Sequence, residues 1–473
     1  MTLSRYTAAT SILEKLIDGS LKPSTLMEET LHRIEKINPT VNAIVALRDT
    51  KNLMDEAFCL DNVDYSGPLH GLPIAVKDLV NVAGIRSTQG SSILSDFVPE
   101  QDDLLASRLR SAGAIIIGKT NTPEFGLGSH TFNSVYGVTR NPYNLSLSCG
   151  GSSGGAAVAL ATGMLSLADG SDMMGSLRNP AGWNNVYGFR PSWGMIPDGP
   201  KEETFLHQLS TLGPMARHPQ DILLLLNVMM GCDRYQPHYT RETPLISLTG
   251  QSIEGLRFAW LRDWDGAFQI EDGILETCEA ALRIFEEMGA VIETPKPPFD
   301  AETMFQSWST LRSWQISTSL SNVIQREGAL KDSVIWELRH GKKLSAFDVH
   351  AASCVRSHWF RVVEDMFDQF AGIFLPTAQV WPFPNEVAYP REINGVLMDT
   401  YHRWMQVMVP ASLVGLPALA MPAGFGKNDL PIGLQLIGRR WSDSQLLSIG
   451  ASYDKLTDWC YKGVSNLRCF FDD

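Results

Sequence analysis

The feature that most constrains the fold of this 473-residue chain is a glycine-rich turn that runs directly into small apolar residues. The turn spans residues 149–155, and the alanine-rich stretch spans 156–161. A flexible linker would be flanked by polar residues, so this turn belongs in a packed core. Residues 153–164 therefore predict a helix that packs tightly, because glycine lets other backbone segments approach closely.

Short apolar segments and amphipathic segments alternate along the rest of the chain. Helices are expected at 7–18, 24–37, 50–60 and 102–112, and strands at 41–47, 74–76, 114–117, 373–375, 418–421 and 432–437. This alternation predicts an α/β fold with a parallel or mixed sheet. Because apolar strands occur near both ends, we expect one large domain over 1–473 rather than several of roughly 150 residues.

Composition excludes several classes of protein. The chain carries 39 Lys and Arg against 52 Asp and Glu, a formal charge of −13, and 44% of its residues are hydrophobic. Intrinsically disordered chains lack that apolar content. Nucleic acid and anionic membrane surfaces are disfavoured as partners, because both attract clustered positive charge. The sequence leaves open whether the chain forms a homodimer.

The cysteines predict neither a disulfide framework nor a metal site. They are odd in number, scattered and without a Cys-x-x-Cys pair: Cys59, Cys149, Cys232, Cys278, Cys354, Cys460 and Cys469. The N-terminal residues lack the apolar core of a signal peptide. Residues 407–425 are interrupted by prolines and glycines, whereas a membrane helix needs about 20 consecutive apolar residues. We therefore expect a cytoplasmic protein.

One match to a nucleotide-binding motif fails on its context. Residues 113–120 satisfy G-x-x-x-x-G-K-[ST], a pattern in which a glycine-rich loop opens a helix and its amides bind phosphate. Here the four middle residues are Ala-Ile-Ile-Ile, which predict a strand, and Asn-Thr-Pro follows, which predicts a turn. A nucleotide-binding or scaffolding protein stays an alternative that titration with ATP would test.

Three segments hold residues suited to chemistry, and each also has a purely structural explanation. Lys77 follows an apolar strand and could pair with Asp78, the 149–155 turn could simply join two elements, and residues 169–181 could form a capped turn with an Asp–Arg pair. Cys149 has no histidine paired with it, so we interpret it as a buried small residue rather than a nucleophile.

Together these segments resemble the amidase signature family. The matched elements are the lysine after the apolar strand, the Gly-Gly-Ser-Ser-Gly-Gly turn and the block from Gly170 to Ala181, and Ser152 and Ser176 lie 24 residues apart. Further matches occur at 118–125, 139–143, 188–192, 417–418 and 431–438. The resemblance is dense over 65–200, thin over 230–370, and returns at 371–450.

The resemblance implies an architecture and an activity. The fold would be a central twisted mixed β-sheet flanked by helices on both faces, with a helical segment at 1–60, the catalytic core at 65–200 and a helical, substrate-shaping region at 230–370. The enzyme would cleave the C–N bond of a small carboxamide to acid and ammonia or amine, through a Ser–cis-Ser–Lys triad and an acyl-enzyme. It would need no cofactor and no metal.

The resemblance also assigns roles to residues. Ser176 would be the nucleophile, Ser152 would relay its proton after a cis Gly151–Ser152 peptide, and Lys77 would be the base. A lysine serves as a base only when neutral, so burial must lower its pKa. The oxyanion hole would consist of the backbone N–H groups of Met173, Met174, Gly175 and Ser176. Supporting roles would fall to Gly151, Ser153, Ser171, Asp172 and Arg178.

The chain departs from the family pattern beside the nucleophile. Met174-Gly175-Ser176 stands where the family usually has Gly-Gly-Ser. Two interpretations stay open: Met173 and Met174 narrow the acyl pocket, or their side chains point into the core. The same choice between pocket and core applies to five aromatic residues of the 300–400 region: Trp308, Trp314, Trp359, Trp381 and Tyr401.

Two related functions fit this resemblance. The first is a stand-alone amidase with a small-molecule amide as its substrate, which residues 129–133 and the Asp-Met-Met-Gly-Ser block favour. The alternative is the glutaminase subunit of a tRNA-dependent amidotransferase, which shares the triad but works with partner subunits.

Overall fold

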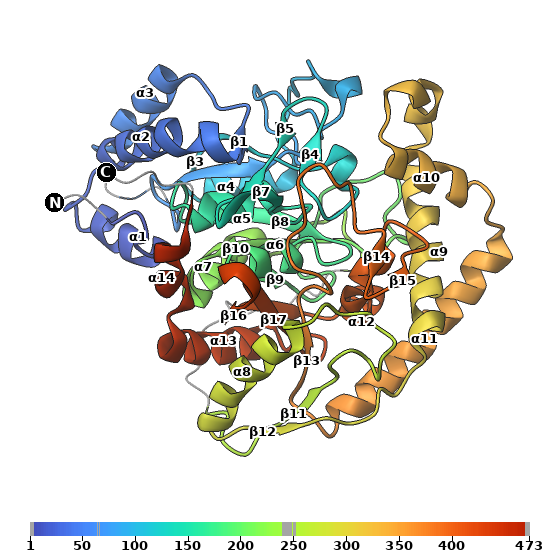
Figure 1. Ribbon diagram of the computed structural model, residues 1–473. Coiled ribbons are helices and arrows are strands. Elements are labelled where there is room, and N and C mark those ends of the chain that lie inside the picture. The colour runs from blue at the N-terminus through green and yellow to red at the C-terminus, as the bar shows by residue number, and fades with distance from the viewer. Residues whose placement is uncertain (1–3, 64, 66, 239–247, 249–251, 469–473) are drawn as a thin grey trace.

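A mixed β-sheet runs through the centre of the computed structural model, which describes residues 4–63, 65, 67–238, 248 and 252–468 (Figure 1). Its strands are β8 (Leu167–Asp172), β9 (Tyr187–Arg190), β10 (Thr211–Ala216), β11 (Arg257–Trp260), β12 (Val291–Glu293), β13 (Gly372–Pro376), β16 (Ala418–Phe425) and β17 (Pro431–Ile437). Within the described residues, the sheet has eight strands in the order β12-β11-β13-β17-β16-β9-β10-β8.

The pairing of these strands joins the two ends of the sequence in one domain. β11 is parallel to β12 and to β13, whereas the other neighbours in the sheet are antiparallel. β9 pairs with β16, so that Phe189 lies opposite Leu419. The predicted mixed sheet and single domain are therefore confirmed, and this pairing explains why apolar strand segments recur near both ends of the chain.

A smaller sheet lies beside β8 and carries the end of one apolar strand to the site. It consists of β1 (Ile44–Val45), β2 (Pro73–Lys77) and β3 (Ile115–Thr120), with β2 parallel and β1 antiparallel to β3. β3 contains most of the phosphate-loop match, so residues 115–120 form a strand and not the opening of a helix. The strand expected at 41–47 is reduced to Ile44–Val45.

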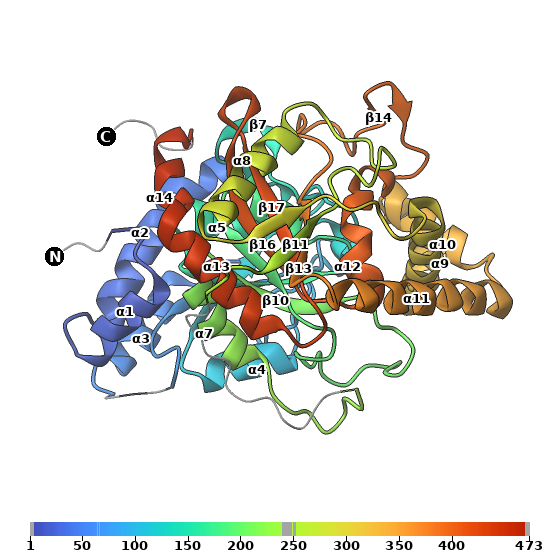
Figure 2. The same ribbon diagram turned by 90° about the horizontal axis from the view of Figure 1, so that it is seen from below.

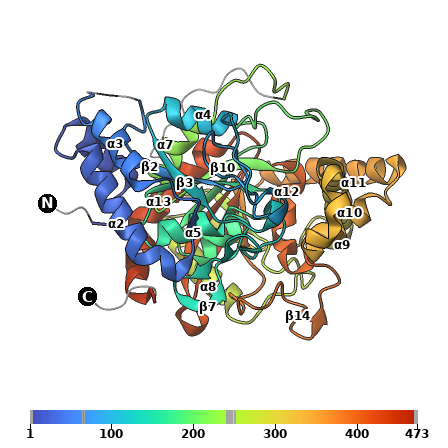
Figure 3. The same cartoon turned by 90° about the horizontal axis from the view of Figure 1, so that it is seen from above.

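Helices cover both faces of the large sheet, as expected. The helices that contact its strands are α5 (Gly154–Ala161), α6 (Arg178–Trp183), α7 (Pro219–Met229), α8 (Ile274–Glu287), α13 (Asp443–Thr457) and α14 (Trp459–Lys462). The helices α2 (Pro23–Val41), α3 (Thr50–Leu60) and α4 (Leu104–Ser111) contact the small sheet, and α1 (Ala9–Ile17) packs on α7. Seen from below, α8 and α13 lie in front of the sheet (Figure 2), and seen from above, α5 does (Figure 3).

A helical unit flanks the sheet on one side, where Figure 1 shows it in yellow and orange. It contains α9 (Ala301–Ser319), α10 (Asp332–Gly341) and α11 (Ala346–Phe367), and α12 (Val409–Val414) packs against it. Short hairpins complete the fold: β4 (Phe132–Asn133) with β5 (Gly137–Val138), β6 (Arg140–Asn141) with β7 (Asn144–Ser148), and β14 (Glu392–Ile393) with β15 (Val396–Leu397). The range 230–370, expected to be helical, thus contains α8, α9, α10 and α11 but also β11 and β12 of the large sheet.

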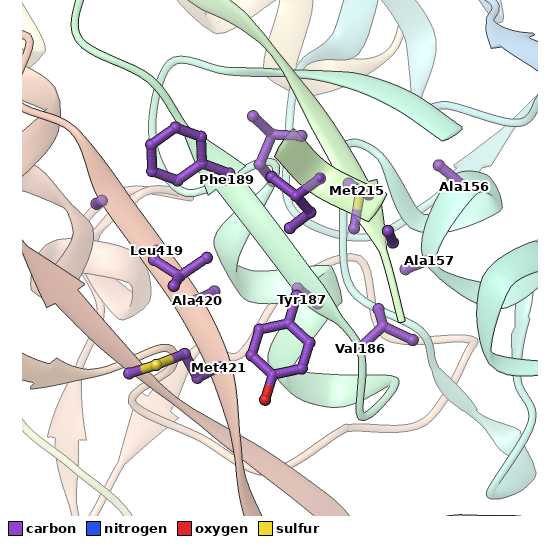
Figure 4. Close-up of a cluster of buried hydrophobic side chains, with 14 of the residues drawn as sticks. Ala156, Ala157, Val186, Tyr187, Phe189, Met215, Leu419, Ala420 and Met421 are labelled. Carbon is purple, nitrogen blue, oxygen red and sulfur yellow. The ribbon is translucent and has the colours of Figure 1, made fainter. Parts of the chain in front are cut away.

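The glycine- and alanine-rich helix is packed as tightly as its composition indicates. Every residue of α5 is buried, and a Cβ added to Gly155 would lie 2.3 Å from the backbone nitrogen of Asn121. Figure 4 shows Ala156 and Ala157 in a cluster with Met215 of β10 and Tyr187 of β9. Because there is no room for larger side chains, α5 holds the turn at its N-terminus against the sheet.

Two sequence expectations outside the sheet can also be compared with the structure. The six described cysteines are free thiols, and Cys469 lies outside the described residues. No described helix is long and apolar enough to cross a membrane. The apolar stretch at 407–425 instead contains α12 and the whole of β16.

Candidate active site

Lys77 is the last residue of β2 and lies where the small sheet meets β8. Its side chain is 1% exposed, and its backbone N–H donates to Asp169 Oδ1 at 2.9 Å. Burial lowers the pKa of the Lys77 ammonium from 10.5 to about 7, against the opposing effect of the Asp169 and Asp172 charges. At neutral pH a large share of this lysine is therefore unprotonated.

The glycine-rich turn brings two serines to this lysine. Lys77 Nζ lies 2.8 Å from Ser152 Oγ and 2.8 Å from Ser153 Oγ, and 3.1 Å from Ser171 Oγ on β8. The Gly151–Ser152 peptide bond is cis, as the resemblance implies. Among the described residues, the hydrogen-bond partners of the Lys77 nitrogen are thus three hydroxyl groups and no carboxylate. A neutral amine is tolerated in such an environment.

Asp172 organises the loop that leads to Ser176. Its carboxylate accepts from Arg178 Nε at 3.0 Å and Nη2 at 3.0 Å, and from Arg190 Nη1 at 3.2 Å. All three side chains are fully buried. The two guanidinium groups hold the pKa of Asp172 well below its usual range despite its burial, so the carboxylate stays ionised.

Arg178 is in turn held by elements that are distant in the sequence. Its Nη1 donates to Gln435 Oε1 on β17 at 2.6 Å, and its Nη2 donates to Ser412 Oγ on α12 at 2.7 Å. The resemblance implied a structural role for Arg178, and the structure adds Gln435 and Ser412 as its partners. It also adds Arg190 as a second cation on Asp172. Arg190 and Gln435 lie inside family-like segments of the sequence, but no local pattern pointed to this contact.

The loop from Met173 to Ser176 has one amide that is already engaged. The Gly175 N–H donates to Asp172 Oδ1 at 2.8 Å, which leaves Met173, Met174 and Ser176 as candidate donors to an oxyanion. Gly175 has φ +82°, and a Cβ there would lie 2.5 Å from Met408 Cγ. Glycine is therefore required at this position for both its conformation and its size.

A pocket brings the two serines of the proposed triad to one surface. It is lined by Leu79, Phe125, Gly126, Leu127, Gly128, Ser129, Ser152, Ser171, Met173, Met174, Ser176, Ser210, Arg312, Ile316, Tyr401, His402 and Met405. Ser176 is 9% exposed, and its carbonyl oxygen accepts from the Ser153 N–H at 3.2 Å. A substrate in this pocket would thus reach both Ser152 and Ser176.

Met173 and Met174 both line the pocket and both contact the hydrophobic core, so the pocket and core interpretations apply together. Met174 is 6% exposed and belongs to the hydrophobic core, yet it also lines the pocket, as does Met173. Among the five aromatic candidates, Tyr401 lines the pocket, whereas Trp308, Trp359 and Trp381 are buried in the core and Trp314 packs against it. Arg312 and His402 line the pocket and carried no signal in the sequence.

Two other candidate chemistries, a cysteine nucleophile and a metal site, find no support among the described residues. Burial raises the pKa of the Cys149 thiol to about 12, which disfavours the nucleophilic thiolate. Among the described residues, no group of three or more His, Cys, Asp or Glu side chains could hold a metal ion.

Comparison with known proteins agrees with the fold and the motifs. A family model for amidases matches residues 25–447. The chain is 31% identical over 474 residues to an acylamidase of Rhodococcus erythropolis, covering 97% of each protein. It is 30% identical over 490 residues to one of the subunits of glutamyl-tRNA(Gln) amidotransferase from Lacticaseibacillus paracasei, covering 96% of this chain and 97% of that protein.

A solved structure extends the likeness to three dimensions. The crystal structure of a bacterial aryl acylamidase of the amidase signature enzymes matches with a TM-score of 0.91 at 26% identity, covering 98% of both chains. The fold expected from the resemblance is therefore confirmed. Since the family model spans most of the sequence and full-length relatives are about 30% identical, the chain belongs to the amidase family.

Proposed function

We propose that this protein is an amidase that hydrolyses a small carboxamide through Ser176, Ser152 and Lys77. The observation that carries the proposal is the buried contact of 2.8 Å between Lys77 Nζ and Ser152 Oγ, with the pKa of Lys77 lowered to about 7. A serine hydroxyl needs a base at neutral pH. A lysine that is partly neutral at this pH can supply it.

The reaction follows from these groups. Ser176 Oγ attacks the amide carbon as its proton passes to Ser152, while Ser152 passes its own proton to Lys77. Amides of the 173–176 loop stabilise the negative oxygen, and one such donor is typically worth about 3–4 kcal/mol. The proton returns from Lys77 through Ser152 to the leaving nitrogen as the C–N bond breaks. Water then attacks the acyl-enzyme by the same route and releases the acid.

Labelling with a fluorophosphonate tests the nucleophile directly. The wild-type protein is expected to gain one phosphonyl group, detected by intact-protein mass spectrometry, and Ser176→Ala is expected to gain none. Ser153→Ala serves as the matched control, because it removes a neighbouring hydroxyl and keeps Ser176. Labelling that persists in Ser176→Ala would overturn the assignment of the nucleophile.

The second candidate function is that of a glutaminase subunit in a tRNA-dependent amidotransferase. It is favoured by the full-length relatives that belong to glutamyl-tRNA(Gln) amidotransferases, which are 30% identical to this chain. The two functions differ in substrate and in dependence on partners. Release of ammonia by the isolated chain from simple aliphatic and aromatic amides, but not from L-glutamine, would support the stand-alone amidase. The reverse preference would support the glutaminase.

A further inference from the structure

A buried arginine of α9 faces the pocket that contains Ser176. Arg312 lines this pocket and is 5% exposed. Among the described residues that line the pocket, Arg312 is the one Lys, Arg, Asp or Glu side chain. The reaction proposed above does not use Arg312, although this residue lines the same pocket as Ser176.

The guanidinium is oriented by residues from two other segments. Arg312 Nε donates to Glu337 Oε1 of α10 at 2.5 Å, and Nη2 donates to the Tyr401 hydroxyl at 3.2 Å. Glu337 also accepts from the Tyr401 hydroxyl at 2.6 Å and from Ser313 Oγ at 2.6 Å. Because these contacts hold Nε and Nη2, the planar guanidinium has a defined direction.

Within the described part of the chain, the third nitrogen of the guanidinium, Nη1, has a weak acceptor alone. Arg312 Nη1 lies 2.9 Å from the thioether sulfur of Met173, and Met173 lines the same pocket and is half-buried. A thioether is a weak acceptor, whereas a guanidinium N–H bonds strongly to oxygen. Methionine has a flexible side chain, so an oxygen atom of a bound molecule can displace this sulfur at small cost.

The charge around Arg312 limits which oxygen would bind there. Glu337 is fully buried against Arg312, and the guanidinium and His402 hold the pKa of its carboxyl well below the usual range. The pair is therefore formally neutral. A substrate carboxylate would lose its hydration without gaining an unpaired cation, whereas a neutral carbonyl oxygen has far less hydration to lose.

We propose that Arg312 is a specificity-determining residue that donates from Nη1 to a neutral carbonyl oxygen of the substrate other than the one under attack. This inference rests on the proposed amidase function. It predicts a preference for amides that carry a second carbonyl group a few bonds from the scissile one.

Matched substrates test the proposal. The para-nitroanilides of pentanoic acid and levulinic acid differ only in one ketone on the acyl side, and the succinic monoanilide places a carboxylate there. Acetamides of butylamine and of its ketone analogue place the same change on the amine side. We expect kcat/KM for the ketone of one series to exceed that of its parent by about tenfold or more, the gain from one charge-assisted hydrogen bond.

Two variants separate recognition from folding. Arg312→Met with Glu337→Gln removes both charges together, because removing one alone would leave a buried ion unpaired. It is expected to keep its far-ultraviolet circular dichroism and to lose the ketone preference. Met173→Leu leaves the ion pair intact and removes the competing sulfur, so the ketone preference should rise.

The outcomes distinguish this proposal from the function on which it rests. Absence of hydrolysis of every anilide and acetamide by the wild type would overturn the proposed function itself. Hydrolysis with equal kcat/KM for ketone and parent in both series would leave the amidase in place and overturn the role of Arg312. A preference for the carboxylate over the ketone, or a fall in ketone preference in Met173→Leu, would also overturn it.

Discussion

Replacing Lys77 with methionine is expected to change the stability of the protein in a pH-dependent way. The unfolded chain binds a proton at this lysine with a pKa of 10.5, whereas the folded chain binds it with a pKa of about 7. The folded pKa is lower, so the wild-type free energy of unfolding rises as the pH rises between these two values. Lys77→Met has no titrating group here and lacks this dependence.

The size of the effect follows from the burial and contacts of Lys77. The pKa difference corresponds to about 5 kcal/mol of destabilisation of the wild type at any pH below about 7. The variant also loses hydrogen bonds to Ser152, Ser153 and Ser171, worth about 1 kcal/mol each. At pH 6 we therefore expect Lys77→Met to be more stable than the wild type by about 2 kcal/mol.

At pH 9 the order reverses. About 3 kcal/mol of the wild-type destabilisation has disappeared by then, so Lys77→Met becomes the less stable protein by about 1 kcal/mol. Urea denaturation followed by circular dichroism at both pH values measures the two differences. Ser152→Ala is the control, because it removes one hydrogen bond of Lys77 without removing a titrating group. A difference between Lys77→Met and wild type that is the same at both pH values would refute a lowered pKa at Lys77.

Three further predictions concern the surroundings of Lys77 and Ser176. The kcat/KM for an amide should fall below about pH 7 as Lys77 becomes protonated, and Asp169→Asn should move this fall to lower pH, because the Asp169 charge raises the pKa of Lys77. A shift to higher pH would contradict it. Met174→Gly should widen the range of acyl chains hydrolysed, measured as kcat/KM over a chain-length series, and an unchanged profile and rate would favour a purely core role. Arg178→Met should lower the free energy of unfolding in urea by about 3–5 kcal/mol, because Asp172 loses one of its two buried guanidinium partners; a change under about 1 kcal/mol would contradict it.

The sequence predicts the parts of this protein that depend on neighbouring residues. The turn around Ser152 needs glycines that stand next to it, and the apolar strand before Lys77 is read directly from residues 73–76. The α/β architecture follows from the same local patterns. Strand limits are less predictable, because β1 keeps only two residues of the seven expected once pairing with β3 decides where the strand ends.

Contacts between residues that are far apart in the sequence could not be predicted from any local pattern. Arg178 and Gln435 are 257 positions apart, and Arg312 meets Tyr401 across 89 positions. Hydrophobic periodicity describes one element at a time and cannot show which elements meet. The contacts between α9, α10 and the residues near Tyr401, which form one wall of the pocket, could therefore be identified only from the folded structure.

Lys77 and Asp172 are both buried, and their different partners decide whether burial changes the charge state of each. Both are almost completely excluded from solvent. Asp172 stays ionised because two guanidinium groups contact its carboxylate. Lys77 lies close to a carboxylate too, but Asp169 directs Oδ1 to the Lys77 backbone N–H and leaves Nζ to serine hydroxyls. If Asp169 instead contacted Nζ, it would favour the protonated lysine. The direction of the Asp169 carboxylate therefore decides whether Lys77 can accept a proton at neutral pH.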